Sequence, residues 1–241
     1  MKVSLFVTCL VDQLCPNVGV AVVDVLRRVG CDVVFDERQT CCGQPAFNTG
    51  YRKEARKFAE RFIEIFEGSD ADYIVSPSGS CVAMVKHFHE LFPNDISWQG
   101  RCENIAKKTI EFSSFLVNVL KIEKVGAKFT GKLTWHDACH SLRDLGLLNE
   151  PRILLQNVEN VEFVELNGAE ECCGFGGTFS VKFSEISNAI LEKKISNIED
   201  TNAEYVVACD ASCLMQIGGK LSRNGSKIKP KHIAEILASQ E

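Results

Sequence analysis

The sequence predicts an α/β protein made of two pseudo-symmetric repeats, each a small parallel sheet flanked by helices with cysteines at the carboxyl edge of the sheet. Three observations lead to this prediction. One cysteine pattern occurs twice at closely matching spacing, short apolar runs rich in β-branched residues precede its cysteines, and segments of helical periodicity separate those runs. Strands that alternate with helices are typical of parallel sheets with right-handed crossovers.

The repeated pattern is a leading cysteine, a Cys-Cys-Gly triplet and a trailing cysteine. Eight of the twelve cysteines belong to it: Cys9, Cys41, Cys42 and Cys81 in the first half, and Cys139, Cys172, Cys173 and Cys213 in the second. The leading cysteine is separated from the pair by 31 residues in one copy and 32 in the other. The glycine is separated from the trailing cysteine by 37 and 38. Equivalent positions are therefore offset by 130 to 132 residues, which indicates an internal repeat.

Apolar runs with the character of buried strands precede the leading and trailing cysteines, at residues 3–7, 73–75, 133–135 and 205–208. Similar runs precede the pairs, at residues 33–35 and 163–166. Helical periodicity covers residues 20–29, 51–66, 105–120 and 184–198. Because the carboxyl ends of parallel strands share one edge, the four cysteines of each repeat are expected to meet there.

We place a domain boundary in the polar stretch near Gly126 and Gly131. The first cysteine-rich domain then comprises residues 1–127 and the second residues 128–241.

Composition limits the function classes. The chain has 241 residues, 45% hydrophobic content and a formal charge of -5, and its Lys and Arg are scattered, which argues against nucleic acid as a partner. No apolar run approaches the roughly 20 residues of a transmembrane helix, so no transmembrane segment is expected. The first residues lack the cleavage site of a signal peptide, and we expect a cytoplasmic protein. In that reducing compartment dense cysteine indicates metal or redox chemistry rather than disulfides.

Four converging thiolates are soft ligands that suit iron–sulfur clusters, zinc or cuprous copper. A structural zinc site usually uses two close cysteine pairs. Each repeat has one pair, and its members are adjacent, so their side chains point apart on an extended backbone and grip a single ion poorly. We therefore favour one iron–sulfur cluster per repeat. A zinc-stabilised scaffold and a thiol–disulfide redox protein remain alternatives.

The second repeat carries polar residues that the first lacks. His136 and His140 flank Cys139, where the first repeat has Phe6 and Leu10. Each histidine could ligate a metal, hydrogen-bond to a cluster sulfur, take up a proton or simply lie at the sheet edge. We expect the second centre to be the chemically distinctive one.

Four cysteines lie outside the pattern. Cys209 precedes Cys213 by four residues and is either an additional ligand or a neighbour of the site. Cys31 and Cys102 are expected to be buried as small hydrophobic residues. The role of Cys15 is left open.

The stretches MKVSLFVTCLVD, TCCGQPAFNTGY, SPSGSC, ECCGFGGTFSVK and CLMQIGG resemble motifs of the lactate utilisation protein A family, and the likeness runs nearly end to end. That family is related to the cysteine-rich domains of heterodisulfide reductase B subunits and glycolate oxidase iron–sulfur subunits. The resemblance implies that the eight repeated cysteines bind two clusters, most simply [4Fe–4S], one per repeat.

The resemblance also implies an electron-transfer component of a complex that oxidises L-lactate to pyruvate. The expected partners are a ferredoxin-like iron–sulfur protein and a third lactate-utilisation protein. The reductase domains end in C-x-x-C, but this chain has Ser78 and Asp210 where the first cysteine of that motif would lie. A five-cysteine double cluster is therefore not expected.

Overall fold

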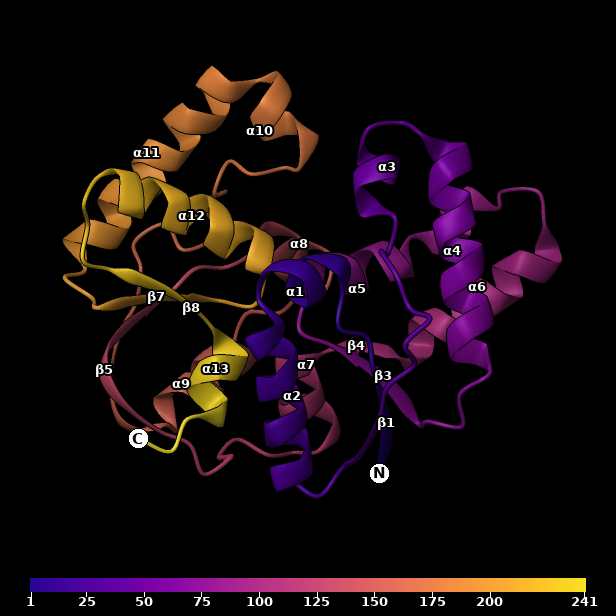
Figure 1. Ribbon diagram of the computed structural model, residues 1–241, viewed down its shortest axis with the longest axis horizontal. Helices are drawn as coiled ribbons and strands as arrows, with labels where there is room; N and C mark the ends of the chain where they lie inside the picture. The colour runs from indigo at the N-terminus through magenta and orange to yellow at the C-terminus, as the bar shows by residue number, and fades with distance from the viewer.

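The computed structural model describes residues 1–241 and contains two four-stranded parallel sheets (Figure 1). The first has the order β2-β1-β3-β4, with β1 Lys2–Leu5, β2 Asp32–Val34, β3 Tyr73–Ser76 and β4 Thr109–Glu111. The second has the order β6-β5-β7-β8, with β5 Lys128–Trp135, β6 Glu159–Val164, β7 Tyr205–Ala208 and β8 Lys229–His232. All neighbouring strands are parallel. The identical order confirms an α/β fold of two pseudo-symmetric repeats.

Helices cover both sheets. In the first half they are α1 Cys9–Leu14, α2 Pro16–Arg28, α3 Gln44–Asn48, α4 Arg52–Glu67, α5 Gly79–Lys86 and α6 Ile96–Lys108, with a 3-10 turn at Phe88–Leu91. The short α7 Phe112–Ser114 and a π turn at Phe115–Val119 lead to β5. The second half has α8 Cys139–Arg143, α9 Glu150–Gln156, α10 Thr178–Lys182, α11 Ser184–Asp200, α12 Ala211–Arg223 and α13 Ile233–Ala238. None of these helices has the length and hydropathy that crossing a membrane requires.

Helices α4 and α11 occupy equivalent places after the two Cys-Cys-Gly turns. Their buried residues recur at an offset of 132: Ala55, Ala59, Phe62, Ile63 and Phe66 in α4, and Ser187, Leu191, Lys194, Ile195 and Ile198 in α11. This spacing forms one buried stripe on each helix. The stripe extends the internal repeat beyond the cysteines themselves.

The glycine of each turn lies directly against the helix that follows it, α4 or α11. A Cβ on Gly43 would be 2.8 Å from Cβ of Phe58, and one on Gly174 would be 2.5 Å from the carbonyl oxygen of Ser187. Both glycines also have positive φ angles, +82° and +83°. Glycine is required at both places because it alone combines this backbone conformation with so close an approach.

The two repeats share one hydrophobic core. A continuous cluster of 39 buried residues joins α2 and β1 of the first half to β5, β7 and α13 of the second. Helix α2 lies beside α13 in Figure 1, and the Arg28 guanidinium donates to the carbonyls of Leu237 and Ala238 at 3.0 and 2.7 Å. A second cluster of 16 residues lies within the first half around Phe62 and Phe66. The domain boundary between residues 127 and 128 stays a prediction, and buried contacts cross it.

The prediction of one helix over residues 105–120 was wrong. Helix α6 ends at Lys108, and Thr109–Glu111 pairs with β3 as the fourth strand of the sheet. The apolar residues of the helix end, the strand and the following turns happen to fall at helical spacing, although β-branched Thr109 and Ile110 favour a strand. Helical periodicity alone therefore does not separate the end of α6, strand β4 and the turns that follow it.

The fourth strand of the second sheet was not predicted either. Strand β8 has the sequence KPKH, and its proline lacks the N–H that a central strand needs. The strand lies at the edge of the sheet, where one side is free of ladder hydrogen bonds. Its polar sequence resembles a loop, so no apolar run marks it.

Glu111 is a buried carboxyl group at the start of α7, where its Oε2 accepts the N–H groups of Ser113 and Ser114 at 2.7 and 3.0 Å. Burial raises the pKa of Glu111 to about 8, from an ordinary value of 4.5. Between these values the folded protein keeps a proton that the unfolded chain has released. The free energy of unfolding therefore falls as pH rises through this window.

We predict that Glu111→Gln, which keeps an acceptor for both amides, loses less stability than the wild type between about pH 5 and pH 8. The difference is on the order of a few kcal/mol, since one pK unit corresponds to about 1.4 kcal/mol. Chemical denaturation of both proteins across this range measures it. Parallel pH dependence of the two proteins would contradict the prediction.

Candidate functional site

The structure places the repeated cysteines at the carboxyl edges of the two sheets. Cys9 and Cys139 begin α1 and α8 directly after β1 and β5. Cys81 and Cys213 lie in the first turn of α5 and α12, after β3 and β7. The adjacent pairs lie in the loops that precede α3 and α10. This is the arrangement expected from parallel strands.

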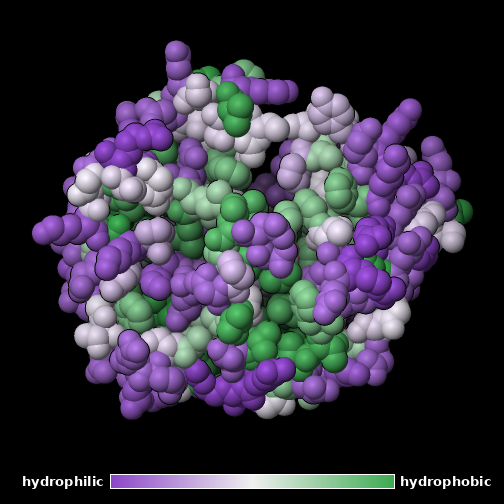
Figure 2. Space-filling model, viewed as in Figure 1, coloured by the Kyte–Doolittle hydropathy of each residue, from purple (hydrophilic) through white to green (hydrophobic).

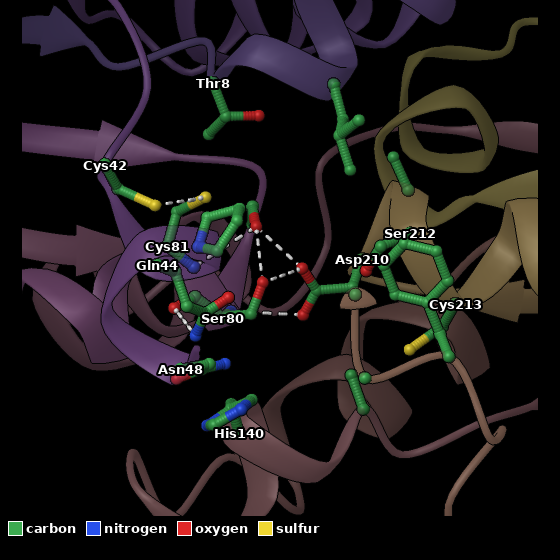
Figure 3. Close-up of a pocket in the computed structure, with 18 of the residues that line it drawn as sticks. Thr8, Cys42, Gln44, Asn48, Ser80, Cys81, His140, Asp210, Ser212 and Cys213 are labelled. Atoms are coloured by element: carbon green, nitrogen blue, oxygen red, sulfur yellow. Dashed lines mark hydrogen bonds between the residues drawn. The ribbon is translucent and has the colours of Figure 1, made fainter. Parts of the chain in front are cut away.

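All eight cysteines line a single cavity of about 240 Å³ between the repeats. Figure 2 shows the molecule hollowed between its two halves, and Figure 3 shows Cys42 and Cys81 on one side of the cavity and Cys213 on the other. The Sγ atoms of Cys42 and Cys81 are 3.4 Å apart. The sequence predicted two separate constellations, and the structure adds that both open onto the same space.

Contacts with neighbouring thiols make Cys41 of the first set acidic. Its interactions with Cys42 and Cys9 lower the pKa of Cys41 to about 3, and the Gly43 amide, 3.4 Å from its Sγ, acts in the same direction. Interaction with Cys41 and burial raise the pKa of Cys9 and of Cys42. One thiolate is thus stabilised by thiol and amide donors.

The second set repeats this pattern. Interactions with Cys139 and Cys173 lower the pKa of Cys172 to about 2. The pKa of Cys213 is lowered to about 6, first by Cys173 and then by the nearby imidazole of His136, although burial opposes this. The second set therefore has two thiols with a lowered pKa, Cys172 and Cys213.

A buried carboxylate joins the two repeats between the cysteine sets. Asp210, 2% exposed, accepts hydrogen bonds from Ser78 Oγ at 2.6 Å and from Ser80 Oγ and N–H at 2.7 and 3.1 Å (Figure 3). It also accepts one from Ser141 Oγ at 3.2 Å. Ser78 and Asp210 are the positions where the reductase motif would have cysteines. The sequence identified them only as departures from that motif, and their contact depends on tertiary structure.

The two flanking histidines have different environments. His140 lines the cavity at a partly exposed position, and its Nδ1 is 2.6 Å from the Asp144 carboxylate. His136 is completely buried, and neither of its ring nitrogens has a hydrogen-bond partner. Its nitrogen and the Sγ atoms of Cys173 and Cys213 lie within 4.8 Å of one another. The structure thus brings His136, but not His140, among the thiols of the second set.

The remaining cysteines lie outside the cavity lining. Cys209 is buried in the shared core with its Sγ 3.2 Å from Ser141 Oγ, which makes it a neighbour of the site. Cys31 and Cys102 are buried as predicted. Cys15 is partly buried between α1 and α2.

Comparison with known proteins identifies the family of this chain. The cysteine-rich domain model named CCG matches residues 3–86 and 133–218, which hold all eight repeated cysteines. Relatives named Lactate utilization protein A are 50% identical in Geobacillus sp. (strain WCH70) and 49% identical in Bacillus subtilis (strain 168), and each match covers 100% of both chains. The chain belongs to the lactate utilization protein A family.

The fold also occurs in a distant solved structure. A hypothetical protein from Helicobacter pylori matches with a TM-score of 0.67 at 10% identity. The match covers 100% of this chain and 49% of that one. This likeness supports the fold alone.

Several residues that hold the cysteine loops of this lactate utilization protein A family member were missed in the sequence. Gln39 accepts the N–H of Val7 at 2.9 Å in the first repeat. In the second, Asp137 accepts from Trp135 Nε1 at 2.6 Å and from both terminal nitrogens of Arg152 at 2.9 and 2.8 Å. Polar residues in loops give no periodic signal, so only the fold identifies these supports.

The donor set fits a metal or cluster bound through sulfur. Each repeat supplies four thiols from three separate segments, and soft thiolates select zinc, cuprous copper or iron–sulfur centres. The second repeat adds a buried imidazole whose nitrogens have no hydrogen-bond partner. Such orphaned groups are rare in proteins, and a bound group with sulfur or metal atoms would satisfy it.

We predict that Asp210→Ala lowers the free energy of unfolding by about 2–3 kcal/mol or more, because charge-assisted hydrogen bonds are lost and buried donors are left without an acceptor. Asp144→Ala is the matched control, since its partly exposed pair with His140 is worth less than about 1 kcal/mol. Denaturant titration of both variants measures the difference. Equal losses in the two variants would contradict a joining role for Asp210.

Proposed function

We propose that this protein is an iron–sulfur electron-transfer component of a complex that oxidises L-lactate to pyruvate. The observation that carries the proposal is the pair of equivalent four-thiol sets on one cavity. The relatives named Lactate utilization protein A supply the link to lactate. A [4Fe–4S] cluster bound in each set would supply a one-electron carrier.

Two carriers match the electron count of the reaction. Oxidation of L-lactate to pyruvate releases two electrons and two protons. Two one-electron clusters, one held by each set of four cysteines, would accept both electrons, and the common cavity would keep the two clusters close. The Gly43 and Gly174 amides that approach the sulfurs of Cys41 and Cys172 suit a group whose charge changes without a proton being transferred at the same site.

The cavity itself is poorly suited to bind lactate. Its lining contains neither lysine nor arginine, and the carboxylate of Asp210 is already present. A substrate carboxylate is usually recognised by an arginine or lysine side chain. This supports electron transfer here, with lactate oxidation on another chain. The proposed partners are a ferredoxin-like iron–sulfur protein and a third lactate-utilisation protein.

A zinc-stabilised scaffold is the second candidate, because one observation favours it. The nitrogen and sulfur atoms of His136, Cys173 and Cys213 lie close together, and zinc binds such mixed sets. The first repeat has phenylalanine at the position of His136, so this argument applies to one centre only. Adjacent cysteines in both repeats favour clusters.

We predict that protein purified without oxygen contains about eight iron and eight acid-labile sulfide atoms per chain, four of each from every cluster. Cys42→Ser and Cys173→Ser are each expected to lose about half of both, because each removes a ligand from one centre. Cys102→Ser is the matched control, since Cys102 is buried outside the cavity, and it retains full content.

Metal and sulfide analysis of the four proteins decides between the candidates. About two zinc atoms per chain without sulfide would replace the proposal with the zinc scaffold. Unchanged iron in both ligand variants would place the clusters elsewhere in the chain.

A further inference from the structure

The two cysteine sets have different neighbours at two equivalent places. The offset of the leading cysteines places His136 where the first repeat has Phe6, and the offset of helices α4 and α11 places Lys194 where it has Phe62. Phe6 and Phe62 are in edge-to-face contact, with ring centroids 4.8 Å apart. Both pack in the apolar cluster that includes Cys42. The second repeat replaces this aromatic pair with an imidazole and an amine.

His136 is a buried group without a partner beside the sulfur atoms. It is 0% exposed, and neither ring nitrogen has a hydrogen-bond partner. An unsatisfied buried polar group destabilises the folded protein unless a bound group supplies its partner. A neutral imidazole always carries one N–H, and the sulfurs of Cys173 and Cys213 lie within 4.8 Å.

A hydrogen bond to sulfur fits His136 better than a bond to the metal. A metal-bound histidine almost always donates its other N–H to a carboxylate, a backbone carbonyl or water. The ring nitrogens of His136 have no carboxylate or carbonyl partner. Its N–H therefore remains available to a sulfur of the bound group or of its thiolate ligands.

Lys194 is the second buried polar group of this region. Its Nζ, on the completely buried side chain, donates to the carbonyls of Gly168 and Ala169 at 2.5 and 3.2 Å. These two residues lie in the loop between β6 and α10 that also contains Cys172 and Cys173. No ion pair includes Lys194, although the Cys173 thiol and the carboxyl groups of Glu171 and Asp137 are near enough to interact electrostatically with its amine.

We propose that His136 and Lys194 make the second centre the electron-accepting member of the pair. The inference rests on the proposed function, in which each set holds a cluster. Reduction adds one negative charge, and hydrogen bonds to sulfur together with a nearby positive charge stabilise that charge. The aromatic pair of the first repeat provides neither. The second centre therefore has the higher reduction potential.

The internal electron transfer follows from this difference. With a cluster in each set, an electron that enters at the first centre would pass to the second, so that the first returns to its oxidised form and the second becomes reduced. No covalent bond forms or breaks, and no proton needs to move. Electrons would leave the protein from the second centre.

An exchange of residues between the repeats tests the proposal. His136→Phe gives the second centre the residue of the first, and Phe6→His does the reverse. Redox titrations of anaerobically loaded protein, followed by electron paramagnetic resonance, give both potentials. We expect His136→Phe to lower the higher potential by at least about 59 mV, which corresponds to a tenfold change in the equilibrium constant of a one-electron reduction. The lower potential is expected to stay unchanged.

The companion variants separate tuning from structural damage. Phe6→His is expected to raise the lower potential. Lys194→Met, which keeps the length of the side chain without its charge, is expected to lower the higher potential. If His136→Phe loses iron, His136→Gln retains an N–H donor and is expected to keep the iron and the high potential. Cys42→Ser, which removes the first centre, assigns the remaining signal to the second.

Two results would overturn this inference and leave the proposed function standing. One is iron-loaded His136→Phe and Lys194→Met proteins with both potentials unchanged. The other is strong nitrogen hyperfine coupling in protein labelled with ¹⁵N-histidine, because direct coordination would replace the hydrogen bond. Wild-type protein without iron and sulfide would instead overturn the proposed function and this inference together.

Discussion

The hydrogen bonds between the Asp210 carboxylate and the serines of the first repeat are the interaction on which the site depends. Each repeat by itself gathers four thiols at a sheet edge, because parallel strands end there. Asp210 fixes those two edges against each other. Ser78 also accepts the N–H of Cys81 at 3.4 Å, so the contact between the repeats reaches a cysteine directly. One cavity, rather than two distant sites, is the consequence.

A second bridge supports the same interface. His232 caps α13 through its side chain, and its Nε2 lies 2.8 Å from the Pro77 carbonyl and 3.1 Å from the Cys209 carbonyl. Pro77 and Cys209 occupy equivalent positions, directly before Ser78 and Asp210. Burial lowers the pKa of His232, which favours its neutral form. Together with the shared core, these contacts explain why an internal repeat forms one continuous structure here.

Much of the scaffold could be predicted from the sequence, because its signals are local. The cysteines recur in register, and β1, β3 and β7 are apolar and β-branched, so their strand character does not depend on distant residues. The strand β8 and the break between α6 and β4 could not be predicted, because both depend on pairing with a neighbouring strand. The common cavity depends on the contacts of Asp210 with the serines of the other repeat, which no local pattern encodes.

The candidate site was predictable to a similar extent. The eight repeated cysteines were predicted from their spacing, and His136 was noted, together with His140, only because it flanks Cys139. Lys194 was not noted, because it lies in the buried stripe of a helix whose other equivalent positions are small or apolar. Its relation to Phe62 emerges only after the helices are superimposed by their buried residues. The difference between the repeats thus resides in a few side chains on a common backbone plan. Small changes of this kind can give two chemically similar centres different reduction potentials.

The most direct test of two centres on one cavity is electron paramagnetic resonance of the fully reduced, anaerobically loaded protein. Two paramagnetic centres on one cavity are expected to give a spectrum split or broadened by magnetic interaction, which simplifies to that of a single centre in Cys42→Ser. A wild-type spectrum equal to the sum of two independent centres, or the absence of any iron signal, would contradict the account.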